Sequence, residues 1–138
     1  MTKEEKQLLL KDLCGRLFYG VKVKVFDESI LLEGNNEKGT LDGKETMSDD
    51  CFVIKCSNDS WIISCEDFKP YLRPMSSMTM VERIELKAIT KGAIQTIGLE
   101  DIVVTTDKGF DYLNAHHIDY RGLIPMGLAL EAPEDMYD

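Results

Sequence analysis

The first part of the chain changes from a helical spacing of apolar residues to strict alternation. Four leucines recur at intervals of three and four residues and form one stripe on a helix: Leu9, Leu10, Leu13 and Leu17. Thr2 and Glu5 have the spacing of a capping box at its start, and Gly15 and Gly20 bracket its end. Valine then alternates with lysine over residues 21–26, which predicts a strand with its valines on the core and its lysines in water.

The next apolar runs predict two hairpins. Residues 29–33 lead into the turn-forming run 34–39, which indicates a hairpin or meander. Residues 51–56 and 61–65 predict another hairpin, with residue 56 opposite 61, 54 opposite 63 and 52 opposite 65. This register places six side chains on the core face: Phe52, Ile54, Cys56, Trp61, Ile63 and Cys65.

The segment after residue 68 differs from the predicted strands before it because it contains two prolines. Pro70 and Pro74 make residues 69–79 a short, stiff connector, extended or with a single turn. Thr79 and Glu82 then form a second capping box at the start of a helix. The apolar face of that helix is predicted to consist of three residues: Val81, Ile84 and Ala88.

The last part of the chain alternates short predicted elements. Gly92 is expected to end the preceding helix, and residues 101–106 have strand-forming chemistry. Residues 107–109 predict a turn, and residues 110–117 have helical spacing. Turns packed on the body follow, and the acidic residues 131–135 are expected to be a frayed end.

Together these patterns predict an α+β protein. An N-terminal helix and a small bent antiparallel sheet, or an SH3-like or Sm-like barrel, precede a helical C-terminal segment. We expect residues 1–68 to form the helix with the small barrel-like domain, residues 69–79 the connector and residues 80–138 the mainly helical segment. A stiff link suits a fixed geometry, so the two halves are expected to pack as one compact unit.

The charge composition of the chain limits the classes of partner that it is expected to bind. Sixteen Lys and Arg against twenty-five Asp and Glu give a net charge of −9, which repels phosphate backbones and disfavours nucleic acid as a partner. The densest basic patch, around Lys22 and Lys24, is thin. The charged start of the chain predicts no secretory signal, and no apolar run is long enough to span a membrane, so we expect a cytoplasmic protein.

The cysteines offer little support for a metal site. None of the four forms a CxxC pair or has a histidine at zinc-finger spacing: Cys14, Cys51, Cys56 and Cys65. Free and mostly buried thiols are expected, and neither a metal nor another cofactor is implied.

One group of residues has the types needed for acid–base chemistry, the histidine cluster of His116, His117 and Asp119. Adjacent histidines on a helix point about 100 degrees apart and rarely share one metal ion. A histidine paired with Asp119 could act as a general base, but no nucleophile is marked out for it. The favoured alternative is structural, with the histidines at a helix carboxyl end and Asp119 paired with Arg121.

Arg73 is the clearest candidate for a binding residue outside that cluster, and Tyr71 and Arg121 are further candidates. The stiff connector could hold its guanidinium against a carboxylate of this chain or of a partner, and an internal carboxylate is favoured. Gly39 and Gly43 fall in a polar turn without the spacing of a phosphate-binding loop, so an ATPase or dinucleotide enzyme is not supported.

Two phrases of the sequence resemble a known family: KPYLRPMSSMT at 69–79 and DYLNAHHIDYRGLI at 111–124, continued by residues 127–133. They are similar to a family of short uncharacterised proteins from the genomes and mobile elements, including prophages, of gut Bacteroidales. Residues 27–65 and 92–109 lack the likeness. The resemblance implies a bacterial cytoplasm and carriage by a phage or plasmid, and it brings no activity, substrate or binding residue.

Three functions remain open from the sequence. The favoured one is a non-catalytic interaction or regulatory protein of a mobile element, with a protein partner that binds an apolar or edge-strand patch. The second is a small enzyme built on the histidine cluster. The third is related to nucleic acid: either a barrel face that uses Lys22, Lys24 and Lys55, or an acidic surface that mimics DNA. Absent catalytic signatures favour a protein that is not an enzyme, and its oligomeric state stays open.

Overall fold

The computed structural model describes residues 1–32, 34, 37–57, 59–90, 94–97, 101–104 and 107–137, without the side chains of 90, 94–97 and 101–104. The elements follow in this order: α1 (Lys3–Gly15), β1 (Lys22–Val25), α2 (Glu28–Leu32), β2 (Lys38–Lys44), β3 (Cys51–Cys56), β4 (Asp59–Ser64), β5 (Phe68–Pro74), the 3-10 helix η1 (Met75–Ser77), α3 (Met80–Thr90), β6 (Ile94–Ile97), β7 (Asp101–Val104), α4 (Asp107–Ala115), β8 (Ile118–Asp119) and β9 (Leu130–Glu131). Among the described helices, none is long and apolar enough to cross a membrane.

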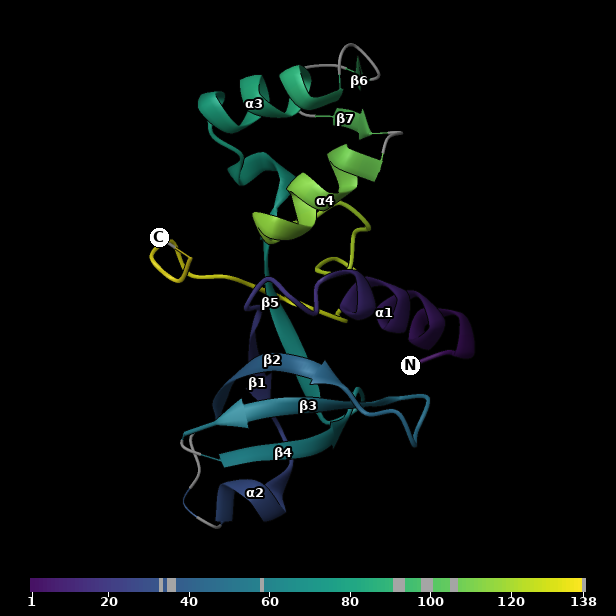
Figure 1. Cartoon of the computed structure of the whole chain (residues 1–138), viewed down its shortest axis with the longest axis vertical. Coiled ribbons are helices and arrows are strands. Elements are labelled where there is room, and N and C mark those ends of the chain that lie inside the picture. Colours follow the sequence, from purple (N-terminus) through teal and green to yellow (C-terminus); the bar gives the residue numbers. More distant parts are fainter. Residues whose placement is uncertain are drawn as a thin grey trace.

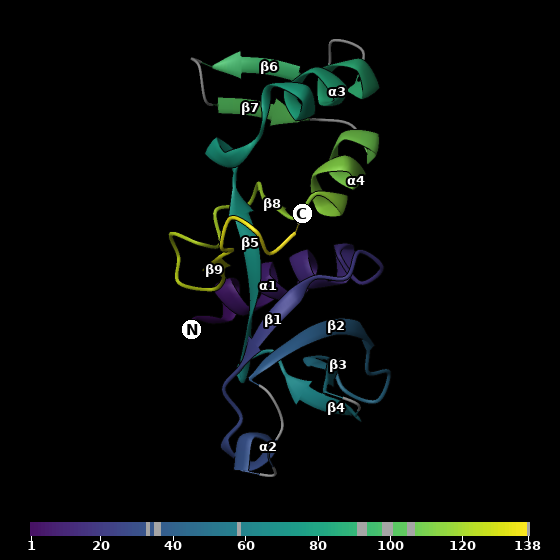
Figure 2. The ribbon, with the colours of Figure 1, turned by 90° about the vertical axis from the view of Figure 1, so that its left-hand side faces the viewer.

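Helix α1 is confirmed as predicted. The hydroxyl of Thr2 accepts a hydrogen bond from the Glu5 amide at 3.1 Å, and the Glu5 carboxylate accepts one from the Thr2 amide at 2.9 Å. Leu9 and Leu13 are buried in the main core, and α1 lies behind β1 and β5 in Figure 2. One face of the sheet is therefore covered by α1.

The sheet is bent and mixed, and it does not close into a barrel. Its strands follow the order β4-β3-β2-β1-β5-β8, with β9 also paired to β5. Within the described part of the chain β4 pairs with β3 alone, so the sheet ends there. The expectation of an α+β fold with a bent sheet is confirmed, whereas the barrel alternative is wrong. Figure 1 shows this sheet at one end of a long molecule, α3, α4, β6 and β7 at the other, and β5 between them.

Two predictions between residues 27 and 44 are wrong. Residues 28–32 form the short helix α2, because the Asp27 carboxylate accepts hydrogen bonds from the Ser29 amide at 3.0 Å and hydroxyl at 2.6 Å, as at a helix start. Gly39 and Gly43, expected in a polar turn, lie in strand β2, which pairs with β1 and β3. Leu41 is the single large apolar residue of this strand, so the strand has no apolar alternation and the pattern did not indicate it.

The second hairpin has the predicted faces and a different register. Ile54 pairs with Trp61 and Phe52 with Ile63, so the strands are shifted by two residues relative to the prediction. The connection is shorter because β4 already begins at Asp59, and Ser57 has the positive φ of 54° that tight hairpin turns require. A shift of two residues leaves each side chain on its original face, so the predicted core face is unchanged.

Residues 69–74 are extended, as predicted for the connector, and they belong to strand β5. Strand β5 pairs antiparallel with β1 through Phe68–Pro70, and parallel with β9 and β8 from Tyr71 onward. In the described residues no strand adjoins Pro70 on its second edge, so its missing amide costs no hydrogen bond there. Only η1 retains the expected single turn.

The far end of the molecule has its own small core. Met78, Leu86, Leu113 and Ile118 are buried there between α3, α4 and β8. The second capping box is confirmed, since Thr79 and Glu82 exchange hydrogen bonds of 2.9 and 3.2 Å.

The predicted apolar face of α3 is wrong. Val81 and Ile84 are 62% and 60% exposed, whereas Glu82 and Leu86 are buried. The sequence pattern favoured the more apolar side of the helix, and an ion pair of Glu82 holds the opposite side against the body.

The last two helix and strand predictions are partly confirmed. Residues 107–109, expected to be a turn, form the first turn of α4. The strand predicted over 101–106 is present as β7 over Asp101–Val104, and residues 105 and 106 and Gly92 lie outside the described residues.

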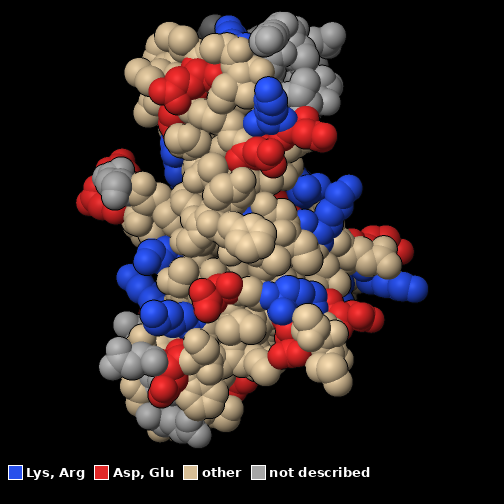
Figure 3. All heavy atoms as spheres, in the orientation of Figure 1, with Lys and Arg blue, Asp and Glu red and all other residues tan. Residues whose placement is uncertain are grey.

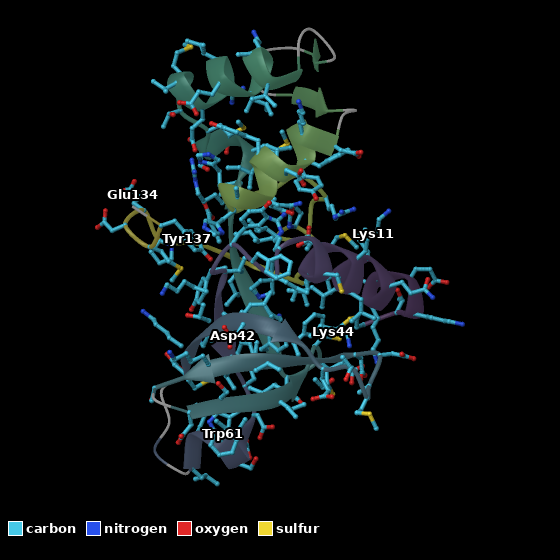
Figure 4. All side chains as sticks on the ribbon, in the orientation of Figure 1. Lys11, Asp42, Lys44, Trp61, Glu134 and Tyr137 are labelled. Atoms are coloured by element: carbon cyan, nitrogen blue, oxygen red, sulfur yellow. The ribbon has the colours of Figure 1, made fainter. Side chains whose placement is uncertain are left out.

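The carboxyl-terminal segment is held in place, so the prediction of a frayed end is wrong. The Tyr137 hydroxyl donates to the Tyr71 carbonyl at 2.7 Å and accepts from the Lys22 amide at 2.9 Å. Its ring stacks on His117, and Figure 4 shows Tyr137 beside the body and Glu134 pointing away from it.

Candidate functional site

His117 lies just beyond the carboxyl end of α4. It adopts a positive φ of 62°, and its ring stacks on Tyr137 with 3.7 Å between ring centroids. Burial lowers the pKa of His117 to about 4, and the charges of Arg16 and Arg73 act in the same direction. Among the described residues its buried Nδ1 has no hydrogen-bond partner, and the neutral ring supplies no positive charge to the helix dipole at neutral pH.

Asp119 closes a turn of the backbone. Its two carboxylate oxygens accept hydrogen bonds from the Leu123 amide at 2.8 Å and the Ile124 amide at 2.9 Å. The predicted pairing of Asp119 with Arg121 is wrong, because Arg121 reaches Asp12 on α1 instead, with 3.1 Å between Nε and Oδ1. The structure does not combine Asp119 with a histidine as a catalytic pair.

His116 and Arg73 both contact the carboxylate of Glu82. Arg73 donates two hydrogen bonds of 2.8 and 2.7 Å to Glu82, and His116 Nδ1 lies 3.1 Å from Glu82 Oε2. Hydrogen bonding to Arg73 lowers the pKa of Glu82 to about 2. The expected internal partner of Arg73 is therefore Glu82, and this contact joins β5, α3 and the end of α4.

A hollow of about 580 Å³ lies beside this contact and is lined in part by Arg73, His116 and Tyr137. A carboxylate can orient a histidine as a base, but the Arg73 guanidinium already neutralises Glu82. The hydroxyls that line the hollow are held by backbone atoms: Ser77 donates to the Pro74 carbonyl, Thr79 accepts from the Glu82 amide, and Tyr137 bonds Tyr71 and Lys22. The arrangement is that of a structural crosslink.

A buried ionic network joins α1 to the carboxyl-terminal turns. Asp12 and Arg16 are fully buried and form two hydrogen bonds of 2.8 and 3.0 Å, and Arg16 also donates to the Ile118 carbonyl at 2.7 Å. The Tyr120 ring lies 5.3 Å from the Arg16 guanidinium carbon and 4.9 Å from that of Arg121. Sequence reasoning missed this network, although the i, i+4 spacing of Asp12 and Arg16 was a signal for it.

In the described residues, the thiols and acidic groups are also candidates for reactive or metal-binding groups. Cys56 and Cys65 are buried, and burial raises the pKa of Cys65 to about 11. In the part of the chain that the structure describes, no three His, Cys, Asp or Glu side chains could jointly hold a metal ion.

The face of the sheet opposite α1 carries a group of lysines. Lys69, Lys24 and Lys38 are direct neighbours in one row across β5, β1 and β2. In the next row, Lys22 pairs with Thr40, and Thr40 with Lys55. We call these five lysines on the face opposite α1 the lysine face.

The lysine face is hollowed and bears an aromatic ring. A depression of about 640 Å³ is lined in part by Lys22, Lys55 and Thr40, with Asp135 as an acidic neighbour. Phe26 follows β1 and is 45% exposed, with the ammonium groups of Lys24 and Lys69 at 5.5 and 6.0 Å from its ring centroid.

Sequence reasoning found only part of this surface. The Val–Lys alternation indicated Lys22 and Lys24, and Lys55 was placed beside them. Lys38 and Lys69 lie in β2 and β5, the two segments expected to be a turn and a connector. Figure 3 shows Lys and Arg side chains gathered along the left side of the sheet, below the carboxyl-terminal segment.

Comparisons with protein-family models, with curated proteins and with solved structures found no match to this chain.

Proposed function

We propose that this chain is a non-catalytic binding protein that holds an anionic partner on the lysine face. Binding would take place in a bacterial cytoplasm during carriage of a mobile element, and the resemblance of residues 69–79 and 111–124 supports that setting. The enzyme alternative has less support, because Asp119, His117 and His116 each serve a separate structural contact.

The observation that carries the proposal is the row of adjacent lysines on an acidic chain. Like charges directly opposite each other across strands destabilise a sheet, and Lys24 has a lysine on both sides. In the described residues, Lys22, Lys24, Lys55 and Lys69 form no ion pair, although the chain carries twenty-five Asp and Glu. A bound polyanion would reduce the repulsion between these neighbouring lysines.

Retention on immobilised heparin tests the proposal, because heparin is a general polyanion. A chain with a pI of about 4.7 is retained at neutral pH only if a local basic surface contacts the resin. We expect the wild type to be retained at low salt, and a Lys22→Gln, Lys24→Gln, Lys55→Gln variant to pass through.

The matched control makes the same change of net charge elsewhere. Lys3, Lys11 and Lys108 are exposed and lie outside the lysine face, and Figure 4 shows Lys11 on α1, away from the carboxyl-terminal turn. The triple Gln variant of these residues should be retained like the wild type. The proposal fails if the wild type is not retained, or if the two triple variants elute together.

A further inference from the structure

We propose that the anionic partner is a single-stranded nucleic acid, with its phosphates along the two lysine rows and one base stacked on Phe26. This inference rests on the proposed function and adds to it the chemical class of the partner. Four features of the lysine face carry it: the continuity of its charge, its aromatic ring, its concave form and its limited extent.

The lysine rows form a continuous track for a phosphate backbone. Adjacent strands lie about 4.8 Å apart, and residues two apart on one strand lie about 7 Å apart, so no lysine of the face is isolated. Lys69, Lys24 and Lys38 cross three strands, and Lys22 and Lys55 lie one step along the same face. A positively charged groove that follows the backbone is the usual electrostatic element of single-strand binding.

Phe26 provides a stacking surface at the end of this track. Its ring is 45% exposed although it follows a buried valine, Val25, and it lies within 6.0 Å of two lysine ammonium groups. Every base has a flat π-face, so an exposed ring beside phosphate-binding lysines accepts a base without reading its identity. We therefore expect little sequence preference.

The depression on the lysine face has the dimensions of a small-ligand pocket. Its volume of about 640 Å³ lies within the range of roughly 300–1,000 Å³ for such sites. Three lysines, Lys22, Lys38 and Lys55, line it together with Thr40, which suits a phosphorylated sugar. Pro133 and Met136 supply an apolar wall.

The rest of the molecule favours a single strand over a duplex or an acidic protein. Asp135 borders the depression and Asp42 lies on β2 in Figure 4, within a chain of net charge −9, so a long straight duplex would meet acidic surface beyond the lysines. A flexible strand can end or turn away. An acidic polypeptide would satisfy the lysines, but its carboxylates give Phe26 no flat ring to stack on.

Fluorescence anisotropy with a labelled oligonucleotide of about twelve nucleotides tests the inference, using single-stranded DNA and RNA of one pyrimidine each. The logarithm of the binding constant should fall linearly with the logarithm of the salt concentration, with a slope of about −2 to −4 for three to five phosphate contacts. Lys24→Gln and Lys55→Gln should each reduce that slope by about 0.7.

Phe26→Leu separates stacking from charge. It should weaken binding on the order of tenfold and leave the salt slope unchanged, because it removes the ring and no charge. Phe18→Leu is its control, since Phe18 is 93% exposed beyond α1 and outside the lysine face. Lys11→Gln is the control for the lysine variants. All of these side chains are at least partly exposed, so the variants are expected to fold.

Competition separates the possible partners. Unlabelled single strand should displace the probe, whereas a duplex, polyglutamate or a mononucleotide should do so only at far higher concentration. If the protein is retained on heparin but binds polyglutamate more tightly than the oligonucleotide, the nucleic-acid inference is wrong. The proposed function would still hold in that case. The inference is also wrong if Phe26→Leu has no effect, or if Lys11→Gln weakens binding as much as Lys24→Gln.

Discussion

At the scale of single residues, the best-defined groups hold the fold together. His117 is neutral, stacked and buried, Asp119 binds two backbone amides, and Arg73 is paired with Glu82. His117 gives a measurable effect of pH on stability, and the buried pair of Asp12 and Arg16 gives a second effect that substitution can measure.

His117 should make the folded chain sensitive to mild acid. Its pKa is about 4 in the fold against 6.5 for an exposed histidine, so between these values the unfolded chain binds a proton that the folded chain does not. The free energy of unfolding should therefore fall as the pH is lowered from 6.5 to 4, by on the order of 2–3 kcal/mol. Urea unfolding at a series of pH values measures it.

The control is His117→Asn, because asparagine tolerates the left-handed backbone at this position. The variant should lose the pH dependence between 6.5 and 4. The effect of Glu82, whose pKa is lowered to about 2, should remain, since its stabilisation is lost only as the pH falls below 4.5. An unchanged slope above pH 4 in the variant would contradict the assignment.

Asp12→Asn should be among the most damaging single substitutions. It leaves the fully buried Arg16 without its counter-charge and removes the ion pair of Arg121. Breaking a buried ion pair in this way destabilises a fold by about 3–5 kcal/mol. Chemical denaturation compares it with Asp49→Asn, an exposed aspartate expected to change stability by less than about 0.5 kcal/mol. A loss below about 1 kcal/mol for Asp12→Asn would show that the pair is not buried as described.

At the scale of elements, the two glycines of strand β2 differ in how closely other atoms approach them. A methyl group on Gly39 would lie 2.7 Å from Ile54 Cγ2 and 3.0 Å from Cys56 Sγ, whereas one on Gly43 would lie 4.0 Å from its nearest contact, Val53 Cβ. Gly39→Ala should therefore cost about 1–3 kcal/mol through overpacking, and Gly43→Ala less than 1 kcal/mol. Equal losses in thermal unfolding would contradict the pairing of β2 with β3.

Sequence patterns recovered the elements whose apolar residues repeat and missed those held by other forces. The leucine stripe of α1 and the faces of β3 and β4 follow periodicity, so they were predictable. Strand β2 is polar and glycine-containing and lies between two paired strands, and α3 is turned inward by the Glu82 ion pair. Such long-range contacts leave no local pattern in the sequence.

The candidate site followed the same rule. Lys22, Lys24 and Lys55 stand at solvent-facing positions of predictable strands, so their shared face could be expected. Lys38 and Lys69 join them only through the pairing of β2 and β5 with β1, which places residues 24, 38 and 69 side by side. The ion-pair partners of Arg73 and Arg121 likewise depend on how distant segments meet.

At the scale of the whole molecule, the lysine face contrasts with the negative net charge of the chain. An acidic chain of net charge −9 gathers five lysines on the face opposite α1, beside a depression and an exposed ring. The exposed apolar side of α3 lies at the other end of the molecule in Figure 1. The central claim is that binding takes place on the lysine face and not at that end.

Chemical-shift mapping tests this claim most directly. A heparin-derived hexasaccharide would be titrated into the isotope-labelled chain, and the backbone amide signals would be followed by two-dimensional NMR. The account predicts that the largest shifts fall on Lys24, Thr40 and Lys55 and their neighbours in β1, β2 and β3. Shifts concentrated on α3 or around His116, or no shifts at low salt, would contradict it.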